Sequence, residues 1–195
     1  PSCGGKLDFK TTFYYVCYDS PSDAHSASSI SSVVHSYGGA GYIIEDGGNY
    51  FVTVSCYYTE QDAQSVCKTL STKGLNCSVR KVEAGDYELR GNAGKNQEKY
   101  LGNLNTLSAL ANVCYNLANS LDDYVCDQSA AKSVLGDVKT GLQSLLRQNQ
   151  SNCFSGELRN LIAECDDVSY GYVLSRDVRR LQIAITDSIV NIRLY

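Results

Sequence analysis

The first part of the chain alternates between short runs typical of strands and a run typical of a helix. Residues 12–18 are rich in aromatic and β-branched side chains, which predicts a strand. Apolar residues then recur three and four positions apart, which predicts a helix. Asp23 can cap its start, and Gly38 can end it in the left-handed conformation. Residues 41–45 predict a second strand. The apolar helix positions are Ala27, Ile30, Val33 and Val34.

The same pattern recurs 36 residues later without a gap. A third strand is expected at 50–55, a second helix from Thr59 to Gly74, and a fourth strand at 77–82. Asp62 follows Thr59 by three positions, as in a capping box. The turn signal Asp46-Gly47-Gly48-Asn49 joins the two copies. The matched pairs are Tyr14 and Tyr50, Val16 and Val52, Ala27 and Ala63, Ile30 and Val66, Val34 and Leu70, Gly38 and Gly74, and Ile43 and Val79.

Residues 11–83 therefore predict a ferredoxin-like βαββαβ unit, a four-stranded antiparallel sheet with both helices on one face. Strand alternation points Val16, Ile43, Val52, Val54 and Val79 toward these helices. The other face has no local cover, so either it binds a ligand or the C-terminal region packs on it. Its expected residues are Phe13, Tyr15, Cys17, Tyr42, Ile44, Phe51, Thr53, Ser78 and Arg80.

The C-terminal half has helical periodicity. Residues 84–97 are polar and glycine-rich, which predicts a linker, and residues 98–195 predict an all-α bundle. One helix is marked by Leu107, Leu110, Cys114, Leu117 and Leu121, and a second covers about residues 129–148. A third apolar stretch can be broken near Gly171, so the bundle has three or four helices. The expected fold class is α+β.

The segment from Phe13 to Arg80 resembles a SPOR domain, the peptidoglycan-binding module of bacterial division and sporulation proteins. The likeness lies in Tyr15-Val16-Cys17-Tyr18, in Phe51-Val52-Thr53-Val54-Ser55-Cys56-Tyr57, in Thr59-Glu60-Gln61-Asp62-Ala63 and in Lys73-Gly74-Leu75.

The resemblance implies that the uncovered sheet face binds peptidoglycan glycan strands. For the helical bundle, which resembles no family, we expect a role in interaction or spacing, as is common for bundles. The implied glycan contacts are Tyr15, Cys17, Tyr42, Phe51, Thr53 and Arg80. Cys17 stands where the family often has Gln, which favours an alternative: a protein–protein scaffold that keeps the fold and has lost glycan binding.

Nine cysteines form no Cys-x-x-Cys pair, which excludes a zinc ribbon and a thioredoxin motif. Two interpretations stay open: an oxidising compartment, or a reduced protein with small buried thiols. Cys114 and Cys165 fall at similar heights on apolar helix faces. We expect them to lie close together, as a disulfide if the compartment is oxidising.

Charge and motifs point away from several function classes. The net charge of −4 is not the basic footprint of a nucleic-acid binder. His25 and His35 have no nucleophile motif beside them, and no metal or nucleotide motif occurs, so we expect no catalysis and no cofactor.

The expected setting of the protein is extracytoplasmic, in the cell wall or a periplasm-like space. The chain begins at Pro1 and contains no Met, so we expect a processed form that has lost a signal or an anchor. No apolar run approaches the roughly 18–20 residues that span a bilayer, so membrane contact is expected only through a segment outside this chain.

Overall fold

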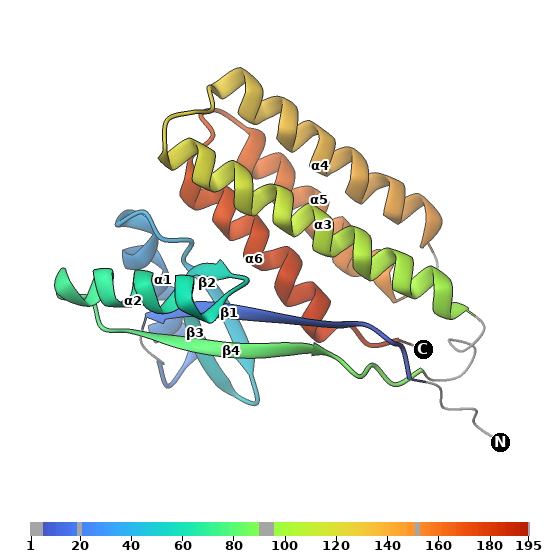
Figure 1. The fold of residues 1–195 in the computed structure, drawn as a ribbon, viewed down its shortest axis with the longest axis horizontal. Coiled ribbons are helices and arrows are strands. Elements are labelled where there is room, and N and C mark those ends of the chain that lie inside the picture. Colours follow the sequence, from blue (N-terminus) through green and yellow to red (C-terminus); the bar gives the residue numbers. More distant parts are fainter. Residues whose placement is uncertain (1–5, 19–20, 90–95, 151–152, 195) are drawn as a thin grey trace.

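A computed structural model describes residues 6–18, 21–89, 96–150 and 153–194. The chain forms four strands and six helices within these residues (Figure 1). The strands are β1 (Lys10–Tyr18), β2 (Tyr42–Asp46), β3 (Asn49–Tyr57) and β4 (Cys77–Gly85). The helices are α1 (Ala24–Ser36), α2 (Glu60–Thr72), α3 (Gln97–Asp122), α4 (Gln128–Gln148), α5 (Phe154–Ser169) and α6 (Ser175–Asn191).

The strands form one antiparallel sheet in the order β2-β3-β1-β4. This order and the βαββαβ succession confirm the predicted unit, and the whole chain is α+β as expected. A register shift between Val16 and Cys17 marks a bulge in the pairing of β1 with β3. The extra residue, Val54, is in β3, so the sheet is more strongly twisted at this point.

Local signals in the sequence fix both helices of the βαββαβ unit. Asp23 accepts a hydrogen bond from the Ser26 amide at 2.9 Å and so caps α1. Thr59 Oγ1 accepts from the Asp62 amide at 3.2 Å at the start of α2. Past the helix ends, Gly38 and Gly74 have φ angles of 92° and 79°, which favour glycine.

Alternation along the strands gives the predicted two faces. Val52 is fully buried with Ala27 and Val34 of α1, and Ile43 and Val54 pack against this cluster. Phe13, Tyr15 and Cys17 belong instead to a larger cluster on the opposite face. The alternation of residues along the strands therefore predicted correctly which face of the sheet these residues lie on.

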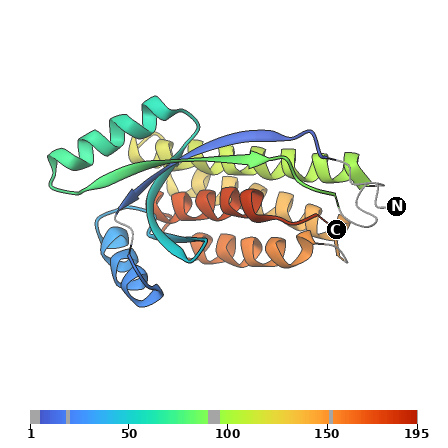
Figure 2. The ribbon, with the colours of Figure 1, turned by 90° about the horizontal axis from the view of Figure 1, so that it is seen from below.

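Helices α3 to α6 form a four-helix bundle in which α3 and α5 each pack on both α4 and α6. The predicted break lies between α5 and α6, where Gly171 has a φ of 84°. Figure 2 shows the strands lying across this bundle. None of the helices that the structure describes has the length and apolarity needed to cross a membrane.

Part of the predicted linker, residues 84–97, belongs to β4 or is buried. Ala84 is still in β4, and Tyr87 and Leu89 are only 7% and 3% exposed. The Tyr87 hydroxyl donates to the Ile189 carbonyl at 2.6 Å. The large apolar side chains of Tyr87 and Leu89 are buried although most residues around them in the sequence are polar. The βαββαβ unit and the bundle consequently share one hydrophobic cluster.

Candidate functional site

The predicted glycan-binding residues do lie together on one sheet face. Cys17 and Tyr42 both pair with Thr53, and Tyr15 pairs with Arg80 across the neighbouring strands. Phe51 pairs with Ile44, which belongs to the same buried cluster, and packs against that cluster itself. Tyr15, Cys17 and Thr53 are at most 1% exposed, whereas Tyr42, Phe51 and Arg80 are partly exposed.

Helix α6 covers this face. Tyr15 donates through its hydroxyl to Thr186 Oγ1 at 3.0 Å, although the two residues are 171 positions apart. Tyr42 donates to Asp187 Oδ2 at 3.1 Å. Gln182 of α6 donates from Nε2 to the Cys56 carbonyl at 3.2 Å. The hydroxyl groups of the central tyrosines on this face are therefore bound by α6 of the same chain.

Helix α6 is buried nearly all round because it lies between the sheet and the bundle. Leu181, Ile185 and Ile189 are completely buried, and so is Ile183 on another side of the helix. Gln182 and Thr186 are buried polar residues that meet the polar groups of the sheet. This second, polar stripe is the part of the site that sequence analysis missed. Its signal was the continuous apolar and small-residue run around Ile183 and Ala184, which an ordinary amphipathic helix lacks.

Phe51 and Arg80 form the edge of the covered face, which we call the rim, and a charged side chain makes the contacts there. The Arg80 guanidinium lies 3.9 Å from the centroid of the Phe51 ring and forms an ion pair with Asp46. A small cavity of about 70 Å³ opens beside it, with Tyr15, Arg80 and Asp187 among its lining residues. Phe51 and Arg80 are the predicted contacts at this rim, and both are partly exposed.

Asp187 is an ionisable group inside the contact between β2 and α6. Burial raises the pKa of its carboxyl to about 6, against the opposing effect of the Tyr42 hydrogen bond. Asn191 donates to its other oxygen at 2.7 Å. Burial also raises the pKa of Tyr42 and of Tyr15 well above the ordinary tyrosine value. The largest cause of these shifts is burial in the contact between the sheet and α6.

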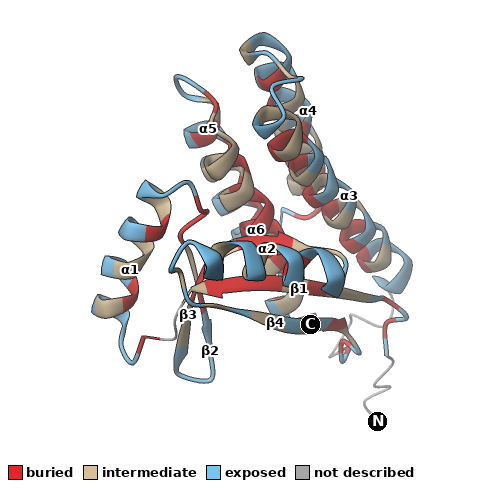
Figure 3. Cartoon of the chain, turned by 60° about the vertical axis from the view of Figure 1, so that its left-hand side comes forward, coloured by how far each residue is buried: buried red, intermediate tan, exposed pale blue. Residues whose placement is uncertain are grey.

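A second surface lies at the end of the bundle where α3 joins α4 and α5 joins α6. Tyr124 and Val125 are 94% and 77% exposed, and Tyr170 and Tyr172 are 90% and 71% exposed. We call these four residues the aromatic end. Figure 1 places both connections at the same end of the bundle, and Figure 3 shows exposed residues along them.

The two connections of the aromatic end are tied to each other. Gln128 donates from Nε2 to the Val173 carbonyl at 2.9 Å and accepts from the Val173 amide at 2.7 Å. Arg179 at the start of α6 donates to Asp122 at the end of α3 at 2.6 Å. The exposed side chains of the aromatic end therefore project from two connections that these hydrogen bonds hold together.

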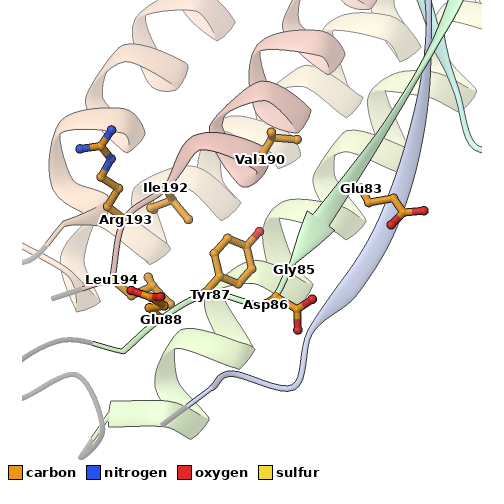
Figure 4. A pocket seen from close by; sticks show the side chains of 9 residues that line it. All are labelled: Glu83, Gly85, Asp86, Tyr87, Glu88, Val190, Ile192, Arg193 and Leu194. Atoms are coloured by element: carbon orange, nitrogen blue, oxygen red, sulfur yellow. The ribbon is translucent and has the colours of Figure 1, made fainter. Parts of the chain in front are cut away.

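Two further hollows with polar linings lie elsewhere on the surface. One of about 470 Å³ between α1, α5 and α6 includes His35, which lies 3.3 Å from Asp177 in an ion-pair geometry. Another of about 290 Å³ lies between the end of β4 and the C-terminal segment (Figure 4). In Figure 4 the Tyr87 ring stands in the middle, while the Arg193 side chain points away.

Neither hollow combines a nucleophile with a base in hydrogen-bond contact. His35 Nδ1 lies near the Ala40 carbonyl at 3.4 Å, and His25 is exposed. Across the described ranges, no three His, Cys, Asp or Glu side chains are grouped so as to hold a metal ion.

Cys114 and Cys165 are both fully buried in the bundle core. Both are free thiols in the structure, and Cys165 Sγ lies 3.4 Å from the Leu135 carbonyl. Burial raises the pKa of Cys114, with a further contribution from Cys165. A bond between them remains a prediction for an oxidising compartment.

No family model and no curated protein matches the chain. Among solved structures, the chain is similar to the solution structure of the peptidoglycan binding domain of the B. subtilis cell wall lytic enzyme CwlC. The similarity covers 37% of this chain and 91% of that chain, at 17% identity and a TM-score of 0.33. At this level the likeness supports no functional argument.

Asp187 gives a pH-dependent test of the covered face. An ordinary aspartate has a pKa near ~4, so between about pH 4 and 6 the folded protein keeps a proton that the unfolded chain has released. The stability contribution of this carboxyl therefore falls as pH rises through that window. Asp187→Asn mimics the neutral form and should gain about 1–3 kcal/mol relative to wild type between pH 4 and pH 7.

Urea unfolding at pH 4, 5, 6 and 7 measures this difference, with Asp137→Asn on exposed α4 as the control. If the wild type and Asp187→Asn change in parallel with pH, the carboxyl is not buried under the sheet.

Proposed function

We propose that this chain is a non-catalytic interaction protein of the cell envelope, in which the sheet holds helix α6 and the aromatic end binds a partner protein. The observation that carries the proposal is the clustering of exposed apolar side chains. In the described part of the chain, four of the exposed large apolar residues are on the two connections of the aromatic end, and the others are Val33 on α1, Tyr37 just after it, and Val113 on α3.

Helix α6 covers the sheet face, so the aromatic end is the more exposed of the two candidate surfaces. Tyr15 and Tyr42 are engaged by Thr186 and Asp187, so their hydroxyl groups are not offered to an external ligand. Tyr124 and Tyr170, by contrast, are almost fully exposed. Tyrosine provides a large contact area with few rotatable bonds, which is why it is enriched in protein interfaces.

The charges around the aromatic end favour a basic partner. Asp123 follows the end of α3, Asp127 caps the start of α4 and Asp167 lies in the last turns of α5, and all three are exposed. The nearby cation Arg179 is neutralised by Asp122. A protein surface with an apolar centre and a rim of Lys and Arg would complement this arrangement. The cell-envelope setting is supported by the SPOR-like residues of the sheet and by the high cysteine content.

Site-specific photo-crosslinking of the full chain in its native cells tests this proposal. A benzophenone side chain at Tyr170 should give a discrete adduct with one protein, and raising the salt concentration should weaken it. The matched control carries the same probe at Glu98, an exposed residue at the start of α3 and thus at the opposite end of the bundle. Equal labelling from both positions, or none from Tyr170, would overturn the proposed surface.

Peptidoglycan glycan is the second candidate ligand, at the rim of the covered face. Phe51 and Arg80 are partly exposed there, and their stacked arrangement offers an aromatic ring beside a cation. An aromatic face suits the C–H groups of a sugar, and the guanidinium suits a carboxyl or hydroxyl group. The residues of the SPOR resemblance include both side chains.

Co-sedimentation of the whole chain with purified sacculi tests this candidate. Glycan recognition predicts stronger pelleting after amidase has removed the stem peptides, and a several-fold loss in Phe51→Ala. Tyr124→Ala, at the far surface, should pellet as wild type does. No pelleting with either kind of sacculus would exclude glycan, whereas loss in Tyr124→Ala alone would assign binding to the aromatic end.

A further inference from the structure

A pair of cysteines on the outer layer of the βαββαβ unit lies in contact. Cys67 is on α2 and Cys77 begins β4, and the Cys67 thiol donates to the Cys77 carbonyl at 2.8 Å. This contact places the Cys67 sulfur beside the main chain of Cys77. A disulfide between the two residues requires Cα atoms closer than about 7 Å.

The sheet register places both thiols on the same side. Cys77 pairs with Tyr18, which packs with the apolar residues under α1, so Cys77 faces the layer of α1 and α2. Helix α2 packs on β4 and β1 from that side. Cys17 precedes Tyr18 and therefore faces the opposite way, into the cluster shared with the bundle. Cys67 is thus the partner that Cys77 can reach.

The two thiols differ in accessibility from the cysteines of the bundle core. Cys67 and Cys77 are both partly exposed, whereas Cys114 and Cys165 are fully buried in the bundle. Burial, with a smaller contribution from Cys67, raises the pKa of the Cys77 thiol to about 11. The hydrogen bond from the Cys67 thiol to the Cys77 carbonyl is the direct evidence that the two residues are close. Oxidants and reductants in solution can reach this pair.

We propose that Cys67 and Cys77 form a reversible disulfide that fastens α2 to β4, a modification site independent of the aromatic end. The oxidant is a small-molecule disulfide such as glutathione disulfide. One protein thiolate attacks a sulfur of that disulfide, which releases one glutathione and leaves a mixed disulfide. The second protein thiolate then attacks the protein sulfur and expels the second glutathione. Two protein thiols are oxidised, and one glutathione disulfide is reduced to two glutathione molecules.

Peptide mapping tests the bond directly in the full chain. After treatment with glutathione disulfide and alkylation of remaining thiols, trypsin and a glutamate-specific protease release residues 61–68 and 74–80, each with one cysteine. The proposal predicts that these peptides are linked in the monomeric band of a non-reducing gel. The linked species should be absent in Cys67→Ser and present in Cys126→Ser, which removes a partly exposed thiol elsewhere.

The oxidised protein should also unfold at a temperature on the order of 5–10 °C higher than the reduced protein, because the bond closes a loop in the unfolded chain. This increase should disappear in Cys67→Ser. The inference is overturned if both peptides of the oxidised wild type are alkylated or glutathionylated, or if either cysteine is linked to a different residue. Wild-type mapping alone decides this, so a poorly folded variant would not obscure the result.

Discussion

Burial of α6 between the sheet and the bundle is the constraint on which the rest of the structure depends. The helix supplies Ile185 and Ile189 to a common hydrophobic cluster, and Thr186 and Asp187 bond to tyrosines of the sheet. Without it, Phe13 and Tyr15 would expose a large aromatic surface to water. The bundle is thus the second layer that covers the sheet. The sheet in turn buries the side of α6 that does not face the other helices.

Most of the fold was predictable because its signals are local. The repeat, the caps at Asp23 and Thr59, and the alternation of Val16 and Val52 against Tyr15 and Phe51 each depend on residues near one another. The occupant of the sheet face was not predictable in the same way. The hydrogen bond from Tyr15 to Thr186 joins residues 171 positions apart, and side-chain type alone does not distinguish a ring that stacks on a sugar from one that packs under a helix.

The polar character of this contact bears on both candidate functions. A glycan-binding face and a face that seats a polar helix both need aromatic rings with hydrogen-bonding groups, so the same residues serve either purpose. In this chain the inner residues bind α6, which leaves Phe51 and Arg80 at the rim and the tyrosines of the aromatic end for external contacts. The partly exposed cysteines of α2 and β4 lie on the opposite side of the sheet, so their oxidation can stabilise the unit without changing either surface.

A double-mutant cycle on Tyr15 and Thr186 tests the central claim most directly. Urea unfolding of Tyr15→Phe, Thr186→Val and the double variant should give a coupling of about 0.5–1.5 kcal/mol, the size of a buried hydrogen bond. Tyr15→Phe combined with Thr140→Val on exposed α4 should show additive effects. A coupling near zero for the first pair would mean that α6 does not cover the sheet, and the face would then be open to a ligand.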